Sequence, residues 1–433
     1  DEHLERLEEA RRRDHRKLGR ELGLFCIDES VGQGLILWKP KGALIRRSLQ
    51  DFITEELDKL GYSQVYTPNI GKLDLYRTSG HFPYYQESQY APIPERDAME
   101  KLSQEGASCA ELFNGLATGT IEGYMLKPMN CPHHIKIYAN DAHSYRDLPV
   151  RLAEFGTVYR WEQSGELGGM TRVRGFTQDD AHIFMTCEQI PDEIAGVVHL
   201  INQVYSKFGF DYFVELSTRP ADSMGSDEDW EDATNGLKTA LEKLGMPYII
   251  NEGDGAFYGP KIDFHLRDCL GRTWQCGTIQ LDFQMPLNFN LEYVDVDGSR
   301  KRPIMIHRVC YGSIERFIGI LTEHFAGKFP TWMAPVQVKV LPVSDKSMDY
   351  AKTVYAALRA KKIRCELDDR NEKIGYKIRE ARQVDRVPYM LILGGQEVEN
   401  NTVSVRDRAT DQTVTCTLDE FIAKISKEIA DRV

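Results

Sequence analysis

The spacing of apolar residues predicts a helix, and then a short strand, in the first part of the chain. In residues 42–60 (GALIRRSLQDFITEELDKL), hydrophobic side chains recur every three or four positions, the period of an amphipathic helix. The segment GYSQVYTP that follows (61–68) has a turn glycine, a short strand-like stretch and a proline. Residues 1–25 are highly charged with a few leucines at helical spacing, so we expect a solvated surface helix there.

Later segments have the shorter period and composition of strands. These are DYFVELST (211–218), RTWQCGTIQLDF (272–283) and IMIHRV (304–309). Their unequal lengths and irregular connections favour a largely antiparallel sheet flanked by helices over regular β–α–β repeats. Two other segments fit neither pattern. Residues 86–122 contain one short helical piece and predict a surface insertion, and the acidic residues 221–232 predict a solvated loop.

The pattern changes near Pro330 and Pro335. Beyond them, strand and helix patterns alternate over about a hundred residues, followed by a hairpin and a last helix. This order predicts a small α/β domain with a mostly parallel sheet. We therefore expect two domains, a larger one over residues 1–334 and a smaller one over residues 335–433.

Composition and charge narrow the classes of function. The 433 residues carry a net charge of −12, which argues against binding nucleic acid by bulk electrostatics alone. No apolar run approaches the roughly 18 residues that would span a bilayer, so we expect no membrane association. The nine cysteines are scattered and form no CxxC pair, which indicates a reducing compartment. We expect a cytoplasmic protein, with an organellar matrix as the alternative.

One segment concentrates groups that bind phosphate. In YRWEQSGELGGMTRVRGFTQDDAH (159–182), Arg160, Arg172 and Arg174 surround a loop with three glycines. A guanidinium group offers a planar fork of donors that matches phosphate geometry, and a glycine-bearing loop can bend closely around a ligand. The segment therefore predicts a binding site for a polyphosphate.

The same segment predicts a hairpin with one polar face. If both flanks of the glycine loop are strands, Arg160 and Glu162 share a face by the two-residue period, as do Gln178, Asp180 and His182 on the partner strand. So many polar groups are costly to bury without partners, which favours a binding site. A solvent-facing hairpin with alternating polar residues is the alternative.

Two further segments carry candidate chemistry. In HRVCYGSIERF (307–317), Arg316 lies in the first turn of a predicted helix, where the helix end already favours anions; alone, this is more simply a core helix with one exposed arginine. In KPMNCPHH (127–134), Cys131 stands beside two histidines, and both residue types bind zinc. A single cysteine or histidine is more often packed, and the sequence alone does not bring Cys131, His182 and His307 together.

Taken together, these segments resemble the class II aminoacyl-tRNA synthetases, and the threonyl family most closely. The helix and strand ending at Pro68 resemble the first motif of the class, YRWE with RVRGFTQDDAHIF resembles the second, and GSIERF resembles the third. MNCPHH, FYGPKIDF, WQCGTIQLDF and FPTWMAPVQV favour the threonyl family over its seryl and prolyl relatives. The resemblance runs from about residue 10 to the C-terminus.

The resemblance implies an α+β fold: a six-to-seven-stranded antiparallel catalytic sheet flanked by helices, then an α/β anticodon-binding domain at residues 335–433. It implies a homodimer that activates L-threonine with ATP and transfers it to tRNA(Thr). It also implies one Zn²⁺ per subunit and Mg²⁺ with ATP. Many relatives remove mischarged serine with an N-terminal editing domain, and we expect none of these 433 residues to form one.

The resemblance also assigns roles to residues. The implied catalytic residues are Arg160, Lys261 and Arg316. The implied ATP-binding residues are Arg160, Glu162, Arg172, Phe176, Gln275 and Arg316. The implied threonine-binding residues are Arg160, Gln178, Asp180, Tyr258 and Gln280. The implied zinc ligands are Cys131, His182 and His307. The implied tRNA contacts, the weakest in sequence support, are Arg370, Lys373, Lys377, Arg379 and Arg406.

This sequence departs from the family pattern at two places. Residues 86–122 form a longer segment than in the commonest bacterial members, which makes the correspondence of His81 unsafe. The small residue usual after His-Arg is here Val309, followed by Cys310 near the implied zinc. The alternatives are a seryl or prolyl synthetase, which the cysteine and histidine set disfavours, and an inactive RNA-binding paralogue, which would be expected to lose Arg160 or Arg316.

Overall fold

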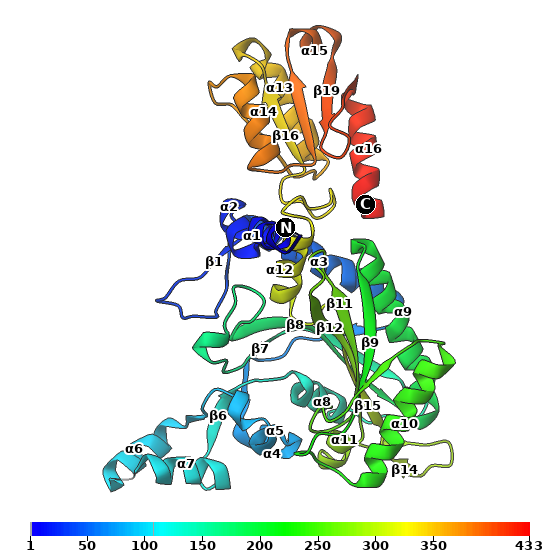
Figure 1. Ribbon diagram of the computed structural model, residues 1–433. Helices are drawn as coiled ribbons and strands as arrows, with labels where there is room; N and C mark the ends of the chain where they lie inside the picture. Colours follow the sequence, from blue (N-terminus) through cyan, green and yellow to red (C-terminus); the bar gives the residue numbers. More distant parts are fainter. Residues whose placement is uncertain (1, 107) are drawn as a thin grey trace. The chain divides into compact units, whose positions relative to one another are not determined.

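The computed structural model describes residues 2–106 and 108–433 (Figure 1). Its contacts divide the chain into two compact units. The large unit comprises Glu29–Leu35 and Ile53–Phe317, and the small unit comprises the remaining described residues, including Ile318–Val433. None of the described helices is both long and apolar enough to cross a membrane.

An eight-stranded sheet forms the centre of the large unit, in the order β10-β9-β11-β12-β15-β8-β7-β3. The pairings from β9 to β7 are all antiparallel, and only the edge strands β10 and β3 pair in parallel. The predicted antiparallel sheet is confirmed, and two short edge strands extend it beyond the six or seven strands implied. The strands are β3 (Ser63–Gln64), β7 (Val150–Tyr159), β8 (Gly175–Met185), β9 (Asp211–Ser217), β10 (Ile249–Asn251), β11 (Lys261–Arg267), β12 (Thr273–Asp282) and β15 (Ile304–Val309).

Helix α9 (Ile190–Phe208) packs on β12, and α10 (Asp227–Lys243) packs on α9, β11 and β12. Gly277 of β12 permits this approach, because a Cβ there would lie 2.7 Å from the hydroxyl oxygen of Tyr205 on α9. That hydroxyl donates to the carbonyl of Cys310 at 2.9 Å, so α9 also holds the loop after β15.

The predicted solvated loop at 221–232 is wrong in its second half, which is the first part of α10. The side chain of Ser226 caps the helix by accepting from the Asp229 backbone N–H. Carboxylates are favoured at a helix N-terminus, and the first turn holds Asp227, Glu228 and Asp229. The acidic run that suggested a loop is therefore a helix start.

The described residues of 86–122 contain two α-helices, where the sequence predicted one short helical piece. They are α6 (Arg96–Glu105) and α7 (Cys109–Thr118), preceded by β5 (Ile93–Pro94). A capping box starts α7, in which Ser108 and Glu111 bond each other's backbone N–H groups. Figure 1 shows α6 and α7 extending away from the large sheet. Their description as an insertion stays a prediction.

The five-stranded sheet of the small unit has the order β17-β16-β18-β19-β20. The first three strands are parallel, but β18, β19 and β20 pair antiparallel, so the sheet is mixed and the prediction of a mostly parallel sheet is wrong. The closing hairpin adds two antiparallel pairings. The elements are β16 (Val338–Pro342), α13 (Met348–Ala360), β17 (Cys365–Leu367), α14 (Ile374–Gln383), β18 (Tyr389–Leu393), α15 (Gly395–Asn400), β19 (Thr402–Asp407), β20 (Thr413–Thr417) and α16 (Leu418–Asp431).

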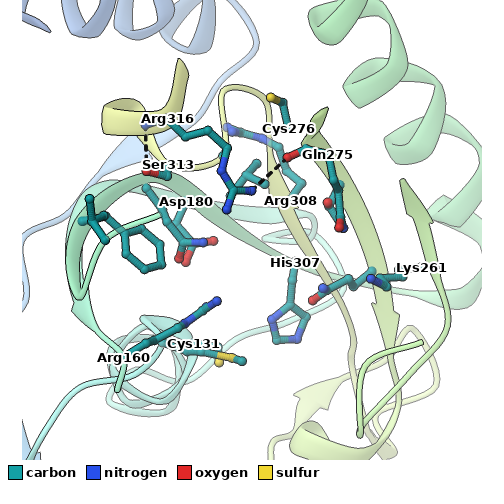
Figure 2. A pocket seen from close by; sticks show the side chains of 18 of the residues that line it. Cys131, Arg160, Asp180, Lys261, Gln275, Cys276, His307, Arg308, Ser313 and Arg316 are labelled. Carbon is teal, nitrogen blue, oxygen red and sulfur yellow. Dashed lines mark hydrogen bonds between the residues drawn. The ribbon is translucent and has the colours of Figure 1, made fainter. Parts of the chain in front are cut away.

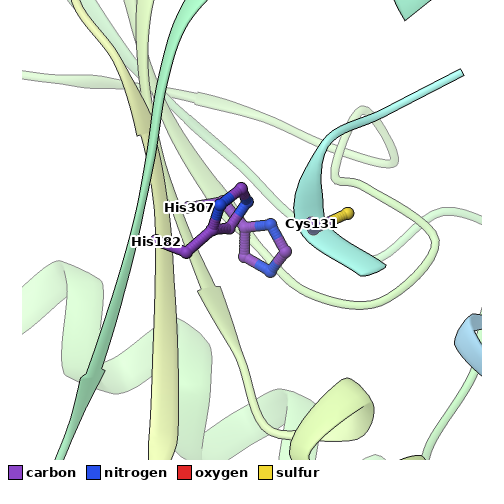
Figure 3. Close-up of side chains that lie close together, drawn as sticks. All are labelled: Cys131, His182 and His307. Carbon is purple, nitrogen blue, oxygen red and sulfur yellow. The ribbon is translucent and has the colours of Figure 1, made fainter. Parts of the chain in front are cut away.

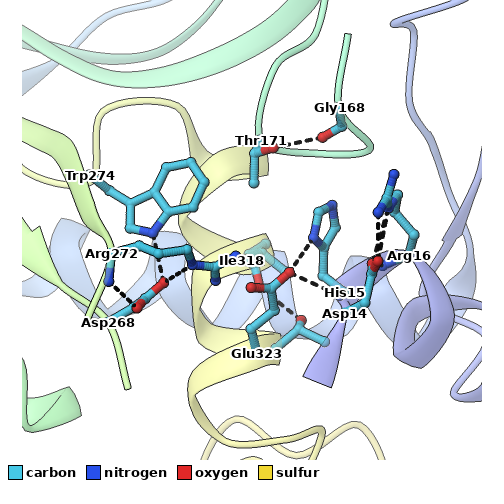
Figure 4. Close-up of polar contacts among 11 residues, drawn as sticks. Asp14, His15, Arg16, Gly168, Thr171, Asp268, Arg272, Trp274, Ile318 and Glu323 are labelled. Atoms are coloured by element: carbon cyan, nitrogen blue, oxygen red, sulfur yellow. Dashed lines mark hydrogen bonds and ion pairs between the residues drawn. The ribbon is translucent and has the colours of Figure 1, made fainter. Parts of the chain in front are cut away.

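The charged N-terminal segment folds as α1 (Glu2–Arg13) and α2 (His15–Glu21). Leu4 and Leu7 of α1 are exposed as predicted, but α2 is not a solvated helix. Its His15 is buried, with Nδ1 2.7 Å from a carboxylate oxygen of Glu323 (Figure 4). A buried imidazole paired with a carboxylate fixes α2 to the rest of the small unit.

The remaining elements connect these parts. The predicted helix at 42–60 is confirmed as α3. These elements are β1 (Phe25–Cys26), β2 (Leu37–Trp38), α3 (Pro40–Lys59), β4 (Ile70–Lys72), α4 (Leu73–Ser79), α5 (His81–Tyr84), β6 (Gly123–Leu126), α8 (Cys131–Ala139), α11 (Gln284–Asn288), β13 (Tyr293–Val294), β14 (Arg300–Lys301) and α12 (Ile314–His324).

Candidate active site

One cavity of about 330 Å³ in the large unit collects every residue that the sequence predicted for ATP, threonine and zinc (Figure 2). Strands β8, β11, β12 and β15 supply many of these side chains. The segment between β7 and β8 supplies Arg160 and Arg172, and the first turn of α12 supplies Arg316. The predicted residues that line it are Cys131, Arg160, Glu162, Arg172, Phe176, Gln178, Asp180, His182, Tyr258, Lys261, Gln275, Gln280, His307 and Arg316.

The two-residue period of β8 sorts its polar side chains between two faces. Gln178, Asp180 and His182 line the cavity, as the alternation predicted. The carboxylate of Asp179, on the opposite face, accepts the backbone N–H groups of residues 310–312 at 2.8–3.0 Å. Asp179 therefore anchors the loop that leads into α12.

Arg160 and Glu162 lie beyond the end of β7, so the prediction that they share a strand face is wrong. One further backbone hydrogen bond, from Arg160 to Arg174, extends the pairing, and then the chain leaves the sheet. The Arg160 guanidinium lies over the rings of Tyr85 and Phe176, 5.4 and 5.1 Å from their centroids. It reaches the cavity from the loop.

The cavity holds more cationic than anionic charge at its arginine end. Arg316 donates to the carbonyls of Thr171 and Gln275, at 2.8 and 3.4 Å, and burial lowers its pKa, as do the neighbouring Arg172 and Arg160. In the described parts of the chain, neither Arg160 nor Arg316 forms an ion pair with a carboxylate, whereas Arg172 lies 3.3 Å from Glu162. Half-buried guanidinium groups without acidic partners fit an anionic ligand.

The side chains on the β11–β12 side of the cavity are polar and form hydrogen bonds and an ion pair with one another. The Asp263 carboxylate lies 3.1 Å from the Lys261 ammonium and accepts from the Gln275 amide at 2.6 Å. The hydroxyl of Tyr258 donates to the side-chain oxygen of Gln280, and burial raises the pKa of this tyrosine, so it stays a donor. This wall presents fixed donors and acceptors to a small polar substrate.

Cys131, His182 and His307 line the cavity and lie close to one another (Figure 3). All three are buried, and one ligand atom from each lies within 4.8 Å of the other two. Burial, with Asp180 and Asp282 nearby, raises the pKa of the Cys131 thiol. Burial and neighbouring histidines lower the pKa of His182, which leaves a neutral imidazole. One sulfur and two imidazole nitrogens are a donor set that suits zinc, whose charge would favour the thiolate.

His81, whose correspondence was unsafe from the sequence, lies beside this group. Its Nε2 is 3.6 Å from the sulfur of Cys131 and 3.0 Å from the sulfur of Met129. Burial, with His307 and Arg160 nearby, lowers the pKa of His81 to about 3. Cys310, in contrast, is not part of the three-residue group.

Sequence reasoning missed several lining residues. Cys276 and Thr278 share the strand period of Gln280 and could have been found from it. Gln275 breaks that period. A bulge on β12 shifts its register against β11 between Phe264 and His265, so the adjacent residues Gln275 and Cys276 both reach the cavity. The missed residues are Met129, Thr171, Val173, Cys276, Thr278, Arg308, Val309, Gly312 and Ser313.

The predicted tRNA contacts in the small unit are dissimilar. Lys373 and Arg379 are exposed on α14 or at its start. Arg370 and Arg406 form ion pairs with Asp368 and Asp411, at 2.7 and 2.9 Å.

Lys377, the fifth of these residues, does not lie on a solvated face, and its role in binding tRNA stays a prediction. It is buried, and its ammonium donates to the carbonyls of Asp368 and Pro342 at 2.9 and 3.4 Å. The distribution of charged residues along α14 did not indicate that Lys377 points inward and donates to carbonyl groups.

Known proteins share this architecture. The class II tRNA synthetase core domain (G, H, P, S and T) matches residues 118–325, and the anticodon-binding domain matches residues 337–428. The threonine–tRNA ligase of Clostridium tetani (strain Massachusetts / E88) is 56% identical over 431 residues, covering 100% of this chain and 63% of the relative. This chain thus spans less than two thirds of the length of the curated relatives it matches.

Solved structures agree. The RNA-binding domain of threonyl-tRNA synthetase from Cryptosporidium parvum Iowa II superposes with a TM-score of 0.87 and 41% identity, covering 96% of this chain and 98% of that one. A prolyl-tRNA synthetase from the same species, bound to halofuginone and AMPPNP, shares the fold at a TM-score of 0.70 and 15% identity, covering 96% of this chain and 77% of that one. With the domain matches, the 41% identity to the Cryptosporidium parvum threonyl-tRNA synthetase domain places the chain in the threonyl-tRNA synthetase family of class II.

Proposed function

We propose that the protein is a threonine–tRNA ligase, which activates L-threonine with ATP and transfers it to tRNA(Thr). The observation that carries the proposal is the meeting, in one cavity, of an arginine cluster with a cysteine and two histidines. An arginine cluster alone would suit many phosphate-binding proteins, and a cysteine with two histidines would suit many zinc proteins. Together they suit a substrate with a phosphate end and an amino-acid end.

The arginine end suits activation of a carboxylate. The carboxylate of the amino acid attacks the α-phosphorus of ATP and pyrophosphate leaves, so no protein side chain has to act as nucleophile. Charge on the phosphoryl oxygens would be stabilised by Arg160 and Arg316, with Arg172 and Mg²⁺ completing the grip. Phe176 offers a ring face to the nucleotide beside Arg160, and Glu162 and Gln275 complete the proposed ATP contacts.

The other end suits the amine and hydroxyl of threonine. We assign Zn²⁺ to Cys131, His182 and His307. Three protein ligands would leave the ion open to substrate, and expansion to five ligands would let it bind the amine and the hydroxyl together as a Lewis acid. The carboxylate of Asp180 accepts a hydrogen bond from the Asn130 amide at 2.9 Å, and it would accept another from the substrate amine. Gln178, Tyr258, Gln280 and Lys261 would orient the rest of the amino acid.

This arrangement predicts a specificity. A site that binds a hydroxyl rejects an isostere without one by roughly 10⁴–10⁵-fold, so valine is excluded. Serine keeps the hydroxyl and loses one methyl group, a difference of about 1–3 kcal/mol. We therefore propose that serine is activated and must be cleared by a separate step.

We further propose a homodimer built on the segment that resembles the first motif. Strand β3 of that segment is an edge of the large sheet, and Tyr66 just beyond it is 88% exposed. An exposed aromatic beside an unpaired strand edge suits a protein interface.

The test is charging of purified tRNA(Thr) with labelled threonine, with tRNA(Pro) and proline as the control pair. We expect threonine attached to tRNA(Thr) and no product in the control. Threonyl-adenylate without any charged tRNA would limit the proposal to activation, and charging of tRNA(Pro) with proline would overturn it.

A further inference from the structure

A line of buried polar side chains runs from His182 away from the cavity. Nδ1 of His182 lies 2.7 Å from Nδ1 of His134, and Nε2 of His134 lies 2.9 Å from a carboxylate oxygen of Glu154. The two histidines are at most 1% exposed and Glu154 is 6% exposed. His134 is the second histidine of the MNCPHH segment, to which the proposed function gives no role.

The acid at the end of this line is firmly held as an anion. Glu154 accepts the backbone N–H of Thr67 at 2.8 Å and its hydroxyl at 2.9–3.0 Å, and the buried ammonium of Lys127 lies 3.9 Å away. Burial opposes ionisation, yet hydrogen bonding from His134 and the Lys127 charge keep the pKa of Glu154 below its ordinary value. Glu154 can therefore only accept hydrogen bonds.

An anion at one end fixes the direction of every hydrogen bond in the line. His134 must donate its Nε2–H to Glu154, so a neutral His134 accepts at Nδ1. His182 must then donate its Nδ1–H to His134, which leaves the lone pair of its Nε2 free. That Nε2 is 3.8 Å from a carboxylate oxygen of Asp180, a residue that lines the cavity.

The other histidine of the group has a shorter version of the same support. Nε2 of His307 lies 2.8 Å from Asp282, whose second oxygen accepts the backbone N–H groups of Gln284 and Met285 at 2.7 and 3.0 Å. Donation to Asp282 leaves Nδ1 of His307 for the cavity. An acid thus orients each of the two imidazoles. Asp282 bonds His307 directly, and Glu154 acts on His182 through His134.

We propose that His134 and Glu154 are positioning residues of the metal site, which set the orientation and tautomer of His182 so that its Nε2 binds the ion. The inference rests on the proposed function, since it needs a metal at Cys131, His182 and His307. Stability alone is a poor reason for the arrangement, because apolar side chains of similar volume would fill this space without the desolvation cost of buried polar and charged groups.

The experiment compares zinc affinity and Co²⁺ absorption spectra across four variants. His134→Leu removes both hydrogen bonds of the line. His134→Gln keeps them, because its amide can donate to Glu154 while its oxygen accepts from His182. Glu154→Gln removes the anion that directs the line. His133→Leu is the matched control, an adjacent histidine whose Nε2 lies 3.4 Å from the Ile70 carbonyl.

We expect His134→Leu and Glu154→Gln to bind zinc about 10–100-fold more weakly than the unaltered protein, the usual effect of losing such a partner. Their Co²⁺ spectra should change, whereas His134→Gln and His133→Leu should keep near-native affinity and spectrum. Thermal unfolding of the metal-free proteins separates loss of the site from loss of the fold. Should His134→Leu not fold, Glu154→Gln decides, because its side-chain oxygen still accepts from Thr67.

Unchanged zinc affinity and an unchanged spectrum in folded His134→Leu or Glu154→Gln would overturn the inference while leaving the proposed function intact. An unaltered protein that binds no zinc would overturn both the inference and the metal part of the proposed function. These two failures are therefore distinguishable in one set of samples.

Discussion

The cations of the active-site cavity and those of the small unit differ in what their side chains contact. In the cavity, Arg160 and Arg316 donate to backbone carbonyls and have no carboxylate partner among the described residues. On the small unit, Arg370 and Arg406 each form an ion pair with a neighbouring acid. The residues that these arginines contact therefore distinguish the cavity from the small unit better than the positions of the arginines in the sequence do.

The difference follows from the cost of holding a charge out of water. A surface ion pair contributes about 0–1 kcal/mol and says little about function. A half-buried guanidinium without an acid loses hydration and gains no ion pair, which lowers the pKa of Arg316. Such a group is best explained by an anion that binds there, and the surface pairs need no such ligand.

The largest effect should come from Cys131→Ala. Loss of the sulfur would remove one proposed zinc ligand, and without the ion the cavity would keep its arginines but lose the proposed contacts to the amine and hydroxyl of threonine. We expect threonine activation to fall by on the order of 10⁴-fold, the factor by which hydroxyl-binding sites discriminate. Zinc content and threonine-dependent pyrophosphate exchange measure this, and near-normal exchange without bound zinc would show that the metal assignment is wrong.

Arg316→Ala should produce a smaller, different loss. Removal of one preorganised charge at the phosphate end should lower the rate of activation by about 10²–10³-fold. Zinc content should not change, because Arg316 contacts backbone carbonyls and none of the three proposed ligands. Loss of zinc together with activity would indicate unfolding and would remove the contrast between the two ends of the cavity.

Lys377→Met should affect stability and not catalysis. The substitution leaves the carbonyls of Asp368 and Pro342 without their buried donor, which destabilises by about 1–3 kcal/mol. The change in the free energy of unfolding is measured from the unfolding transition of the small unit in urea. Unaltered stability, with weaker tRNA binding, would show that Lys377 serves the RNA after all.

Lys373→Ala is the surface counterpart and should have the smallest effect. The side chain is exposed, so the free energy of unfolding should stay within about 0.5 kcal/mol of the native value. If Lys373 contacts a phosphate of tRNA, affinity falls modestly and the slope of log affinity against log salt decreases by about 1. A slope identical to that of the unaltered protein would exclude this contact.

The sequence predicted the architecture where local patterns were strong. The antiparallel strands, α3 and the alternation of Gln178, Asp180 and His182 followed from apolar and polar periods. It failed where tertiary contacts or capping decided the outcome. Examples are the inward turn of Lys377 and the acidic start of α10.

The composition of the candidate site came from resemblance more than from pattern. No period links Cys131 to His307, because they come from different elements that meet only in the fold. The residues behind them were even less visible, since Glu154 and His134 act through other side chains. Roles for these residues stay predictions until the variants are measured.

The most direct test of the proposed function is amino-acid-dependent exchange between ATP and pyrophosphate, with threonine, serine, valine and proline compared and zinc measured on the same sample. A threonine–tRNA ligase with the proposed zinc site should give strong exchange with threonine, weaker exchange with serine and none with valine or proline, in protein that holds one zinc per chain. Exchange with proline, or no exchange with any of the four in folded, zinc-containing protein, would contradict it.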